Sequence, residues 1–114
     1  MSWPKRGNQA PVSGAGVADS ANVTLAASDD GSSRIPNGTL TYTVNAATAW
    51  DLTPAPAGVL IYLPASGTIS VAVSGGPTLN GGTTTLTRTL AANPSGVVAL
   101  SRIQGSNAYG LTGV

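Results

Sequence analysis

The side chains that could take part in acid–base catalysis are few and of one kind. The chain contains no histidine and no cysteine, so a group that titrates near neutral pH would have to be a perturbed carboxylate. The candidates are Asp19, Asp29, Asp30 and Asp51. A glycosidase uses two carboxylates in an aromatic sugar cleft, whereas three of these four lie in apparent turns or in the N-terminal segment. We therefore expect no enzymatic activity.

The same inventory restricts cofactor chemistry. Zinc, iron–sulfur and haem sites need thiolate or imidazole ligands, which this chain does not have. Asp29-Asp30-Gly31, followed by Ser32 and Ser33, offers clustered oxygen atoms that a calcium ion could bind. A calcium loop usually places carboxylates at alternate positions and ends on a further acidic residue, and the chain has no glutamate. An Asx turn is the favoured interpretation, a cation site is the alternative, and we expect no cofactor.

The aromatic residues are candidates for a core or for a binding surface. The chain has two tryptophans, three tyrosines and no phenylalanine. Tyr42 and Tyr62 lie in phase with aliphatic neighbours, which predicts that they fill a core. The alternative, for these two together with Trp50 and Tyr109, is a sugar-binding platform. Trp50 fits a core position and a partner interface equally well, and we include it among the candidate partner-binding residues.

The elements that would position these residues are predicted to be β-strands. Good helix formers are scarce, with one methionine and no glutamate, whereas glycine (15) and proline (8) are frequent. Short β-type runs recur between turn residues at the ~8–12 residue spacing that is typical of a sandwich or barrel. We predict an all-β fold in which residues 23–114 form a single antiparallel β-sandwich, jelly-roll-like, with about seven or eight short strands.

Individual runs predict individual strands. The runs are residues 23–27, 39–44, 59–63, 68–73, 85–90, 97–103 and 108–114, with a shorter one at 49–52. Residues 39–44 alternate strictly, which puts Leu40, Tyr42 and Val44 on one face and threonines on the other.

Two of these runs carry a prediction about pairing. The continuous apolar run 59–63, closed by Pro64, is typical of a central strand. The three residues 65–67 predict a β-hairpin that joins this strand to 68–73. Residues 85–90 are expected to form an edge strand.

Residues 1–22 form the second predicted unit, an extended N-terminal arm. The segment has no strand or helix period and is interrupted by prolines and glycines. Its apolar surface is too small to offset a backbone ordering cost of ~1–2 kcal/mol per residue, so we expect a partner to supply its contacts. Trp3, Pro4, Lys5 and Arg6 are the candidate partner-binding residues, with Trp3 as the aromatic anchor.

Charge is sparse along the chain. The formal net charge is +1, from five basic and four acidic side chains. A nucleic-acid surface normally shows clustered lysine and arginine, so we expect no nucleic-acid partner. No run reaches the ~20 apolar residues of a membrane span, and Lys5 and Arg6 are not followed by an apolar signal region. We therefore expect neither membrane insertion nor a secretion signal.

Three stretches of the β-rich region share a pattern of short strands and glycine-bounded turns. They are Asp30-Gly31 before Thr39-Leu40-Thr41-Tyr42, Leu63-Pro64 ahead of Ile69-Ser70-Val71, and Val97-Val98-Ala99-Leu100 turning through Gly105-Ser106-Asn107 into Tyr109-Gly110-Leu111-Thr112-Gly113. In these stretches residues 23–114 resemble the small jelly-roll or β-sandwich structural proteins of tailed bacteriophages. That group includes capsid cement proteins, also called decoration proteins, and fibre modules.

This resemblance implies a non-enzymatic role in the virion. A cement protein is made in the host cytoplasm and binds the outer capsid surface, where it stabilises the head through contacts with the major capsid protein. Its partners are then the major capsid protein and copies of itself, as a dimer or trimer. The alternative implied by the same resemblance is a tail-fibre or adhesin module that binds cell-surface glycan.

Overall fold

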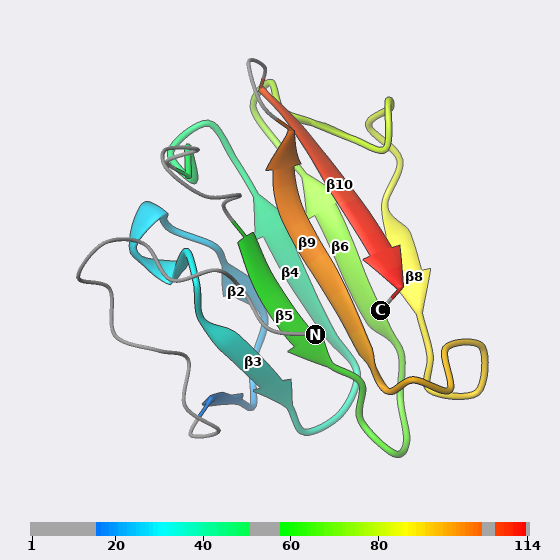
Figure 1. Ribbon diagram of the computed structural model, residues 1–114. Helices are drawn as coiled ribbons and strands as arrows, with labels where there is room; N and C mark the ends of the chain where they lie inside the picture. Colours follow the sequence, from blue (N-terminus) through cyan, green and yellow to red (C-terminus); the bar gives the residue numbers. More distant parts are fainter. Residues whose placement is uncertain (1–15, 51–57, 104–106, 114) are drawn as a thin grey trace.

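The computed structural model describes residues 16–50, 58–103 and 107–113, which form two packed β-sheets (Figure 1). The six-stranded sheet has the order β1-β3-β5-β9-β10-β7. Its strands are β1 (Val17–Asp19), β3 (Ser33–Pro36), β5 (Gly58–Tyr62), β9 (Val97–Ile103), β10 (Ala108–Gly113) and β7 (Thr78–Leu79). The four-stranded sheet consists of β2 (Val23–Thr24), β4 (Leu40–Val44), β6 (Ile69–Val73) and β8 (Leu86–Arg88). The single short 3-10 turn among the described residues, η1 (Ala27–Asp29), follows β2.

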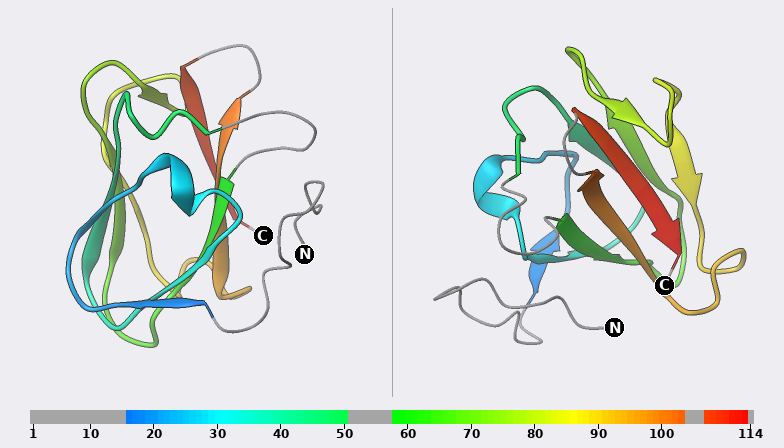
Figure 2. Two further views of the ribbon diagram at one scale, coloured as in Figure 1. Left: turned by 90° about the vertical axis from the view of Figure 1, so that its left-hand side faces the viewer. Right: turned by 45° about the horizontal axis from the view of Figure 1, so that its top comes forward.

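The chain winds around the core between the two sheets. From β1 to β8 successive strands alternate between the six-stranded and the four-stranded sheet, as the edge-on view in Figure 2 shows. Strands β1, β3 and β5 are therefore parallel neighbours in one sheet, and β2, β4 and β6 in the other. Each crossover that parallel pairing requires is provided by a strand of the opposite sheet.

This winding corrects the predicted topology. The structure is an all-β sandwich, as expected, but five of the eight strand pairs among the described residues are parallel, so the antiparallel jelly-roll prediction is wrong. The described residues form ten strands, nine of them within residues 23–114, where seven or eight were predicted. Period-2 alternation indicates which residues form a strand, but it does not indicate whether the chain then folds back in the same sheet or crosses to the other.

The predicted hairpin at residues 65–67 is one place where this ambiguity matters. Strands β5 and β6 belong to different sheets, so the connection between them is a crossover and the hairpin prediction is wrong. Gly67 has a φ of +116°, and a Cβ there would lie 2.9 Å from the Thr39 main-chain nitrogen. The Thr68 main-chain N–H then donates to Thr39 Oγ1 at 3.1 Å. This close approach directs the chain toward β4, and the strand that follows, β6, pairs with β4.

The C-terminal part follows its prediction more closely. Strands β9 and β10 form an antiparallel ladder with six residue pairs, and β5 lies inside its sheet as expected of a central strand. Strand β8 lies at the edge of the four-stranded sheet, as predicted for residues 85–90. Of these contacts, the ladder of β9 and β10 needs only alternation and a short connection.

The core lies between the sheets and includes three aromatic side chains. Tyr42, Trp50 and Tyr109 are fully buried, which confirms the core prediction for Tyr42. Tyr62 is 45% exposed, so the same prediction for Tyr62 is wrong. The run from Val59 to Leu63 is apolar at every position. Because it shows no alternation between apolar and polar residues, the sequence does not indicate which of its residues face inward.

The six-stranded sheet begins inside the predicted arm. Residues 17–19 form β1, which pairs in parallel with β3. The three residues Val17, Ala18 and Asp19 show no alternation between apolar and polar side chains. Asp19, which faces inward, is a carboxylate, so apolar periodicity could not reveal this strand. Residues 1–15 lie outside the described part of the chain.

Candidate interaction surfaces

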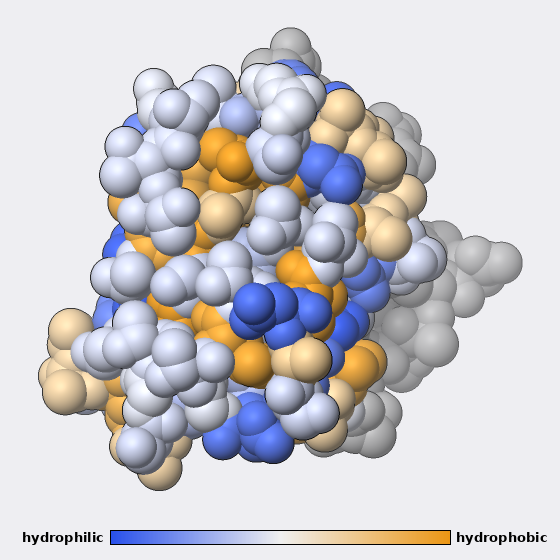
Figure 3. All heavy atoms as spheres, turned by 180° about the vertical axis from the view of Figure 1, so that it is seen from behind, coloured by the Kyte–Doolittle hydropathy of each residue, from blue (hydrophilic) through white to orange (hydrophobic). Residues whose placement is uncertain are grey.

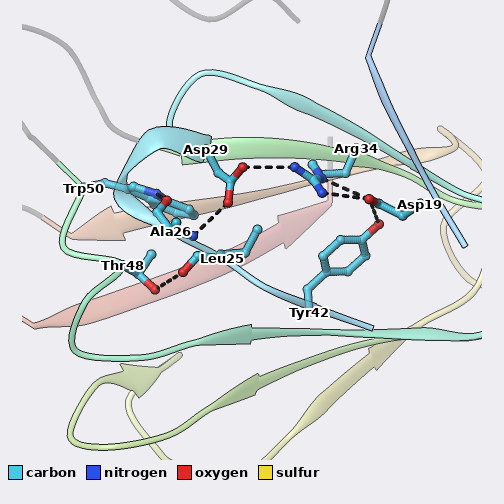
Figure 4. Close-up of polar contacts among 8 residues, drawn as sticks. All are labelled: Asp19, Leu25, Ala26, Asp29, Arg34, Tyr42, Thr48 and Trp50. Atoms are coloured by element: carbon cyan, nitrogen blue, oxygen red, sulfur yellow. Dashed lines mark hydrogen bonds and ion pairs between the residues drawn. The ribbon is translucent and has the colours of Figure 1, made fainter. Parts of the chain in front are cut away.

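A cluster of polar side chains lies between the sheets next to β1 (Figure 4). This polar cluster consists of Asp19, Asp29, Arg34 and Tyr42. The Arg34 guanidinium donates to Asp19 twice, from Nη2 to Oδ1 at 2.7 Å and from Nε to Oδ2 at 3.0 Å. It also donates from Nη1 to Asp29 Oδ1 at 3.0 Å, and the Tyr42 hydroxyl donates to Asp19 Oδ2 at 2.6 Å. These bonds join β1, β3, β4 and η1.

The electrostatics of the polar cluster keep the Tyr42 hydroxyl protonated and the Arg34 guanidinium charged. Burial raises the pKa of the Tyr42 hydroxyl, and its hydrogen bond to the Asp19 carboxylate raises it further. Burial acts to lower the pKa of Arg34, but the hydrogen bond and charge of Asp19, with the charge of Asp29, raise it above its usual value. A neutral phenol and a paired guanidinium are neither base nor nucleophile, and the hydrogen bonds of the polar cluster connect the strands that carry it.

The turn that was a candidate cation site uses its carboxylates internally. Asp29 Oδ2 accepts from the Ala26 main-chain N–H at 2.8 Å, in addition to the bond from Arg34. Asp30 Oδ1 accepts from the Gly58 main-chain N–H at 2.8 Å. Across residues 16–50, 58–103 and 107–113, no group of three or more potential metal-ligating side chains comes together. The two carboxylates thus fix the turn and connect it to β5.

Trp50 belongs to the core and not to the surface. Its indole Nε1 donates to the Ala26 carbonyl at 2.9 Å, and its ring meets Tyr109 edge-on with centroids 5.5 Å apart. The Trp50 carbonyl accepts from Arg102 Nη1 at 2.7 Å. A side chain with no exposed surface offers nothing to a partner, so Trp50 is assigned to the core, the other role that its sequence position allowed. The predicted strand at 49–52 is absent at its described residues, Ala49 and Trp50.

The other candidate partner-binding residues are Trp3, Pro4, Lys5 and Arg6. They all lie outside the described residues, and their assignment remains a prediction.

The outward side of the six-stranded sheet is apolar, which the sequence prediction missed; it is exposed only in part, because Ser33, Leu60 and Ala99 on it are buried. We call it the apolar face. Strand register places on it Ala18, Ser33, Ile35, Gly58, Leu60, Tyr62, Val97, Ala99, Ser101, Ile103, Ala108, Gly110 and Thr112. None of these residues is charged. Ile35, Tyr62 and Ile103 are 40%, 45% and 49% exposed, which makes them three of the four exposed large hydrophobic residues among those described.

One signal in the sequence points to the apolar face. A strand buried on one side alternates between apolar and polar residues, but Val59, Leu60, Ile61 and Tyr62 are apolar in succession. Such a run indicates a strand that is covered on both sides. Val59 and Ile61 face the core, so Leu60 and Tyr62 face outward.

The outward side of the four-stranded sheet has a different chemistry. We call it the threonine face, and register places on it Thr24, Thr41, Thr43, Ser70, Ala72 and Thr87. They form two rows across the sheet, Thr24–Thr43–Ala72 and Thr41–Ser70–Thr87. Figure 3 views this side of the molecule, where residues of intermediate hydropathy predominate. The outward position of Thr41 and Thr43 was predicted from their alternation with Leu40, Tyr42 and Val44.

Comparisons with protein-family models, with curated proteins and with solved structures found no match. Among the described residues, no helix is long and apolar enough to span a membrane.

Proposed function

We propose that this protein is a non-enzymatic capsid cement protein, which binds the outer surface of a phage head and stabilises it through contacts with the major capsid protein. The observation that carries the proposal is the pair of broad, uncharged outward faces on one small sandwich. Both sheets present surface chemistry suited to contact with other proteins. The resemblance to phage structural proteins supplies the class of partner.

Exposed apolar side chains support a binding role for the apolar face. Exposed apolar side chains on a small domain can mark a site of interaction, and Ile35 and Tyr62 lie together at one end of the sheet, with Ile103 at the other end. Tyrosine is also enriched at protein interfaces, because its ring is apolar and its hydroxyl can bond.

The lack of charge supports crowding of many copies on one shell. Neither face carries a charged side chain, and the formal net charge of the chain is only +1. Neighbouring copies, in a dimer or trimer or side by side on the head, would therefore meet little electrostatic repulsion. The threonine face can contact a neighbour through hydroxyl groups without the desolvation cost of an ion.

In this proposal the N-terminal arm makes the specific contact with the major capsid protein. Trp3 fills an apolar pocket, Pro4 limits the conformations of the chain, and Lys5 and Arg6 pair with carboxylates beside that pocket. Trp50 takes no part, because its side chain is buried in the core.

The experiment compares particles of the parent phage that carry the protein with particles that lack it. We expect both to assemble, and we expect the heads without the protein to release DNA at a lower temperature and after milder osmotic shock. A Trp3→Ala variant should decorate heads at lower occupancy than wild type in direct competition, whereas Gln9→Ala in the same arm should not. Heads that withstand heat and shock equally well without the protein would refute the role as cement.

A further inference from the structure

Residues 1–15 join the described part of the chain at one border of the apolar face. Gly16, the first described residue of its range, lies beside this face, because a Cβ at Gly16 would come within 3.1 Å of Ile35 Cδ1 and Ser33 Cβ. Register places both Ile35 and Ser33 on the apolar face. Residues 1–15 are therefore joined to the sheet at the edge of its apolar surface.

The length of this segment is sufficient to cross the face. Fifteen residues span at most ~50 Å when extended. The three strand spacings from β1 to β9 amount to only ~15 Å. The segment can thus reach the exposed side chains of Ile35, Tyr62 and Ile103 with length to spare.

The chemistry of the segment also fits the face. It contains Trp3, Pro4, Pro11 and Val12, and its charged side chains are both cationic and adjacent, Lys5 and Arg6. The apolar face has no charged group, so neither Lys5 nor Arg6 would meet a like charge there. Because the segment is covalently attached, its effective concentration at the face is in the millimolar range, which favours it over the same segment of another molecule.

We propose that in the free protein residues 1–15 dock on the apolar face of their own chain, with the Trp3 side chain against Ile35 and Tyr62, which lie at the same end of the sheet. This docking concerns the free protein and does not rest on the role as cement. If the arm does bind a capsid protein on the particle, it must first leave this face, so a variant that weakens the docking should bind the particle more tightly through its arm.

A nitroxide spin label on the full chain tests the docking directly. The chain has no cysteine, so Ser2→Cys provides a single attachment point beside Trp3. We expect the label to broaden the methyl signals of Ile35 and Leu60 at least about fivefold more than those of Thr24, Thr41 and Thr87, because the two sheets alone are separated by ~10 Å. The threonine methyls on the opposite face are the matched internal control.

Two variants and one mixing experiment make the test decisive. Tyr62→Asp places a charge on the apolar face at a half-exposed position and should abolish the selective broadening, whereas Thr87→Asp on the threonine face should leave it unchanged. Equal broadening of both faces, or of neither, overturns the proposal. In the mixing experiment, chains that carry the spin label are mixed with isotope-enriched chains that carry no spin label. Broadening seen only in this mixture also overturns the proposal, because the segment would then bind another copy.

Discussion

The strands β1 to β6, which wind between the two sheets, and the C-terminal hairpin of β9 and β10 are held together in different ways. We call the strands β1 to β6 the wound half of the molecule. In the wound half, from β1 to β6, the edge strand β1 is fastened by the ion pairs of Arg34 with Asp19 and Asp29. In the hairpin, β9 and β10 are joined by a six-residue antiparallel ladder, and Leu100 and Leu111 pack into the core. A hairpin closes within a few residues, whereas β1 and β3 are joined through a strand of the opposite sheet. In this molecule the edge strand of the wound half is held by specific polar contacts, whereas the hairpin is held by its own ladder and apolar packing.

The largest effect is expected from removal of the Arg34 guanidinium. Arg34→Met would leave the buried carboxylate of Asp19 without its cation, and we expect the free energy of unfolding to fall by ~3–5 kcal/mol. Urea denaturation measures this change. Arg88→Met removes a cation that bonds a neighbouring carbonyl at the surface, and it should change the free energy by less than ~0.5 kcal/mol. Equal effects of the two substitutions would mean that the polar cluster does not fasten the wound half.

A somewhat smaller effect is expected from a cavity in the hairpin. Leu100 is fully buried, and Leu100→Ala should lower the free energy of unfolding by ~2–5 kcal/mol, with no dependence on pH, because only apolar contacts are lost. The measurement is urea denaturation at several pH values. A loss that depends on pH below about pH 9, before the tyrosines titrate, would show that the hairpin also relies on other titrating groups and would remove the contrast between the two halves.

The smallest effect is a loss of stability at alkaline pH. The pKa of Tyr42 is raised in the fold above the ordinary tyrosine value of 10.0, so the unfolded chain loses this proton first as the pH rises. The contribution of this pKa shift to the free energy of unfolding is fully present below pH 10. Above pH 10 the free energy of unfolding should decline by about 1.4 kcal/mol per pH unit for each tyrosine whose pKa is raised. Burial also raises the pKa of Tyr109, so that residue adds to the decline.

Tyr42→Phe separates the two tyrosines. The variant loses one hydrogen bond to a charged group, ~1.5–3 kcal/mol at neutral pH, and should show a shallower alkaline decline than wild type. Denaturation midpoints between pH 9 and pH 11.5 give both quantities. An unchanged alkaline slope would assign the titration to residues outside the polar cluster.

The parts of the fold that the sequence predicts are those that depend on near neighbours. Alternation in residues 39–44 gave the correct inward and outward positions of Tyr42 and Thr43, because period-2 geometry acts within one strand. The antiparallel pairing of β9 and β10 follows from two adjacent runs and a short connection. Neither prediction requires knowledge of a distant segment.

The parts that the sequence could not predict depend on distant or ambiguous neighbours. The bond between Asp19 and Arg34 joins residues 15 positions apart in different strands, and a charged pair has no periodic signal. The outward position of Tyr62 could not be assigned, because every residue around it is apolar. Trp50 had no flanking pattern at all, and its burial results from η1 and β10 folding around it.

The candidate interaction surfaces divide in the same way. The threonine face could be predicted from alternation, whereas the apolar face becomes visible only when the register across β3, β5 and β9 is known. Trp3, Pro4, Lys5 and Arg6 were selected from composition alone, and their role remains a prediction.

Electron cryomicroscopy of purified particles that carry the protein is the measurement that tests the proposed function, because it shows where the protein lies and how many copies are present. If the protein is a capsid cement protein, we expect density for a two-sheet sandwich, repeated in hundreds of copies over the outer surface of the head and in contact with the major capsid protein. A few copies at the tail tip, with none on the head, would contradict the account and would favour a fibre or adhesin module instead.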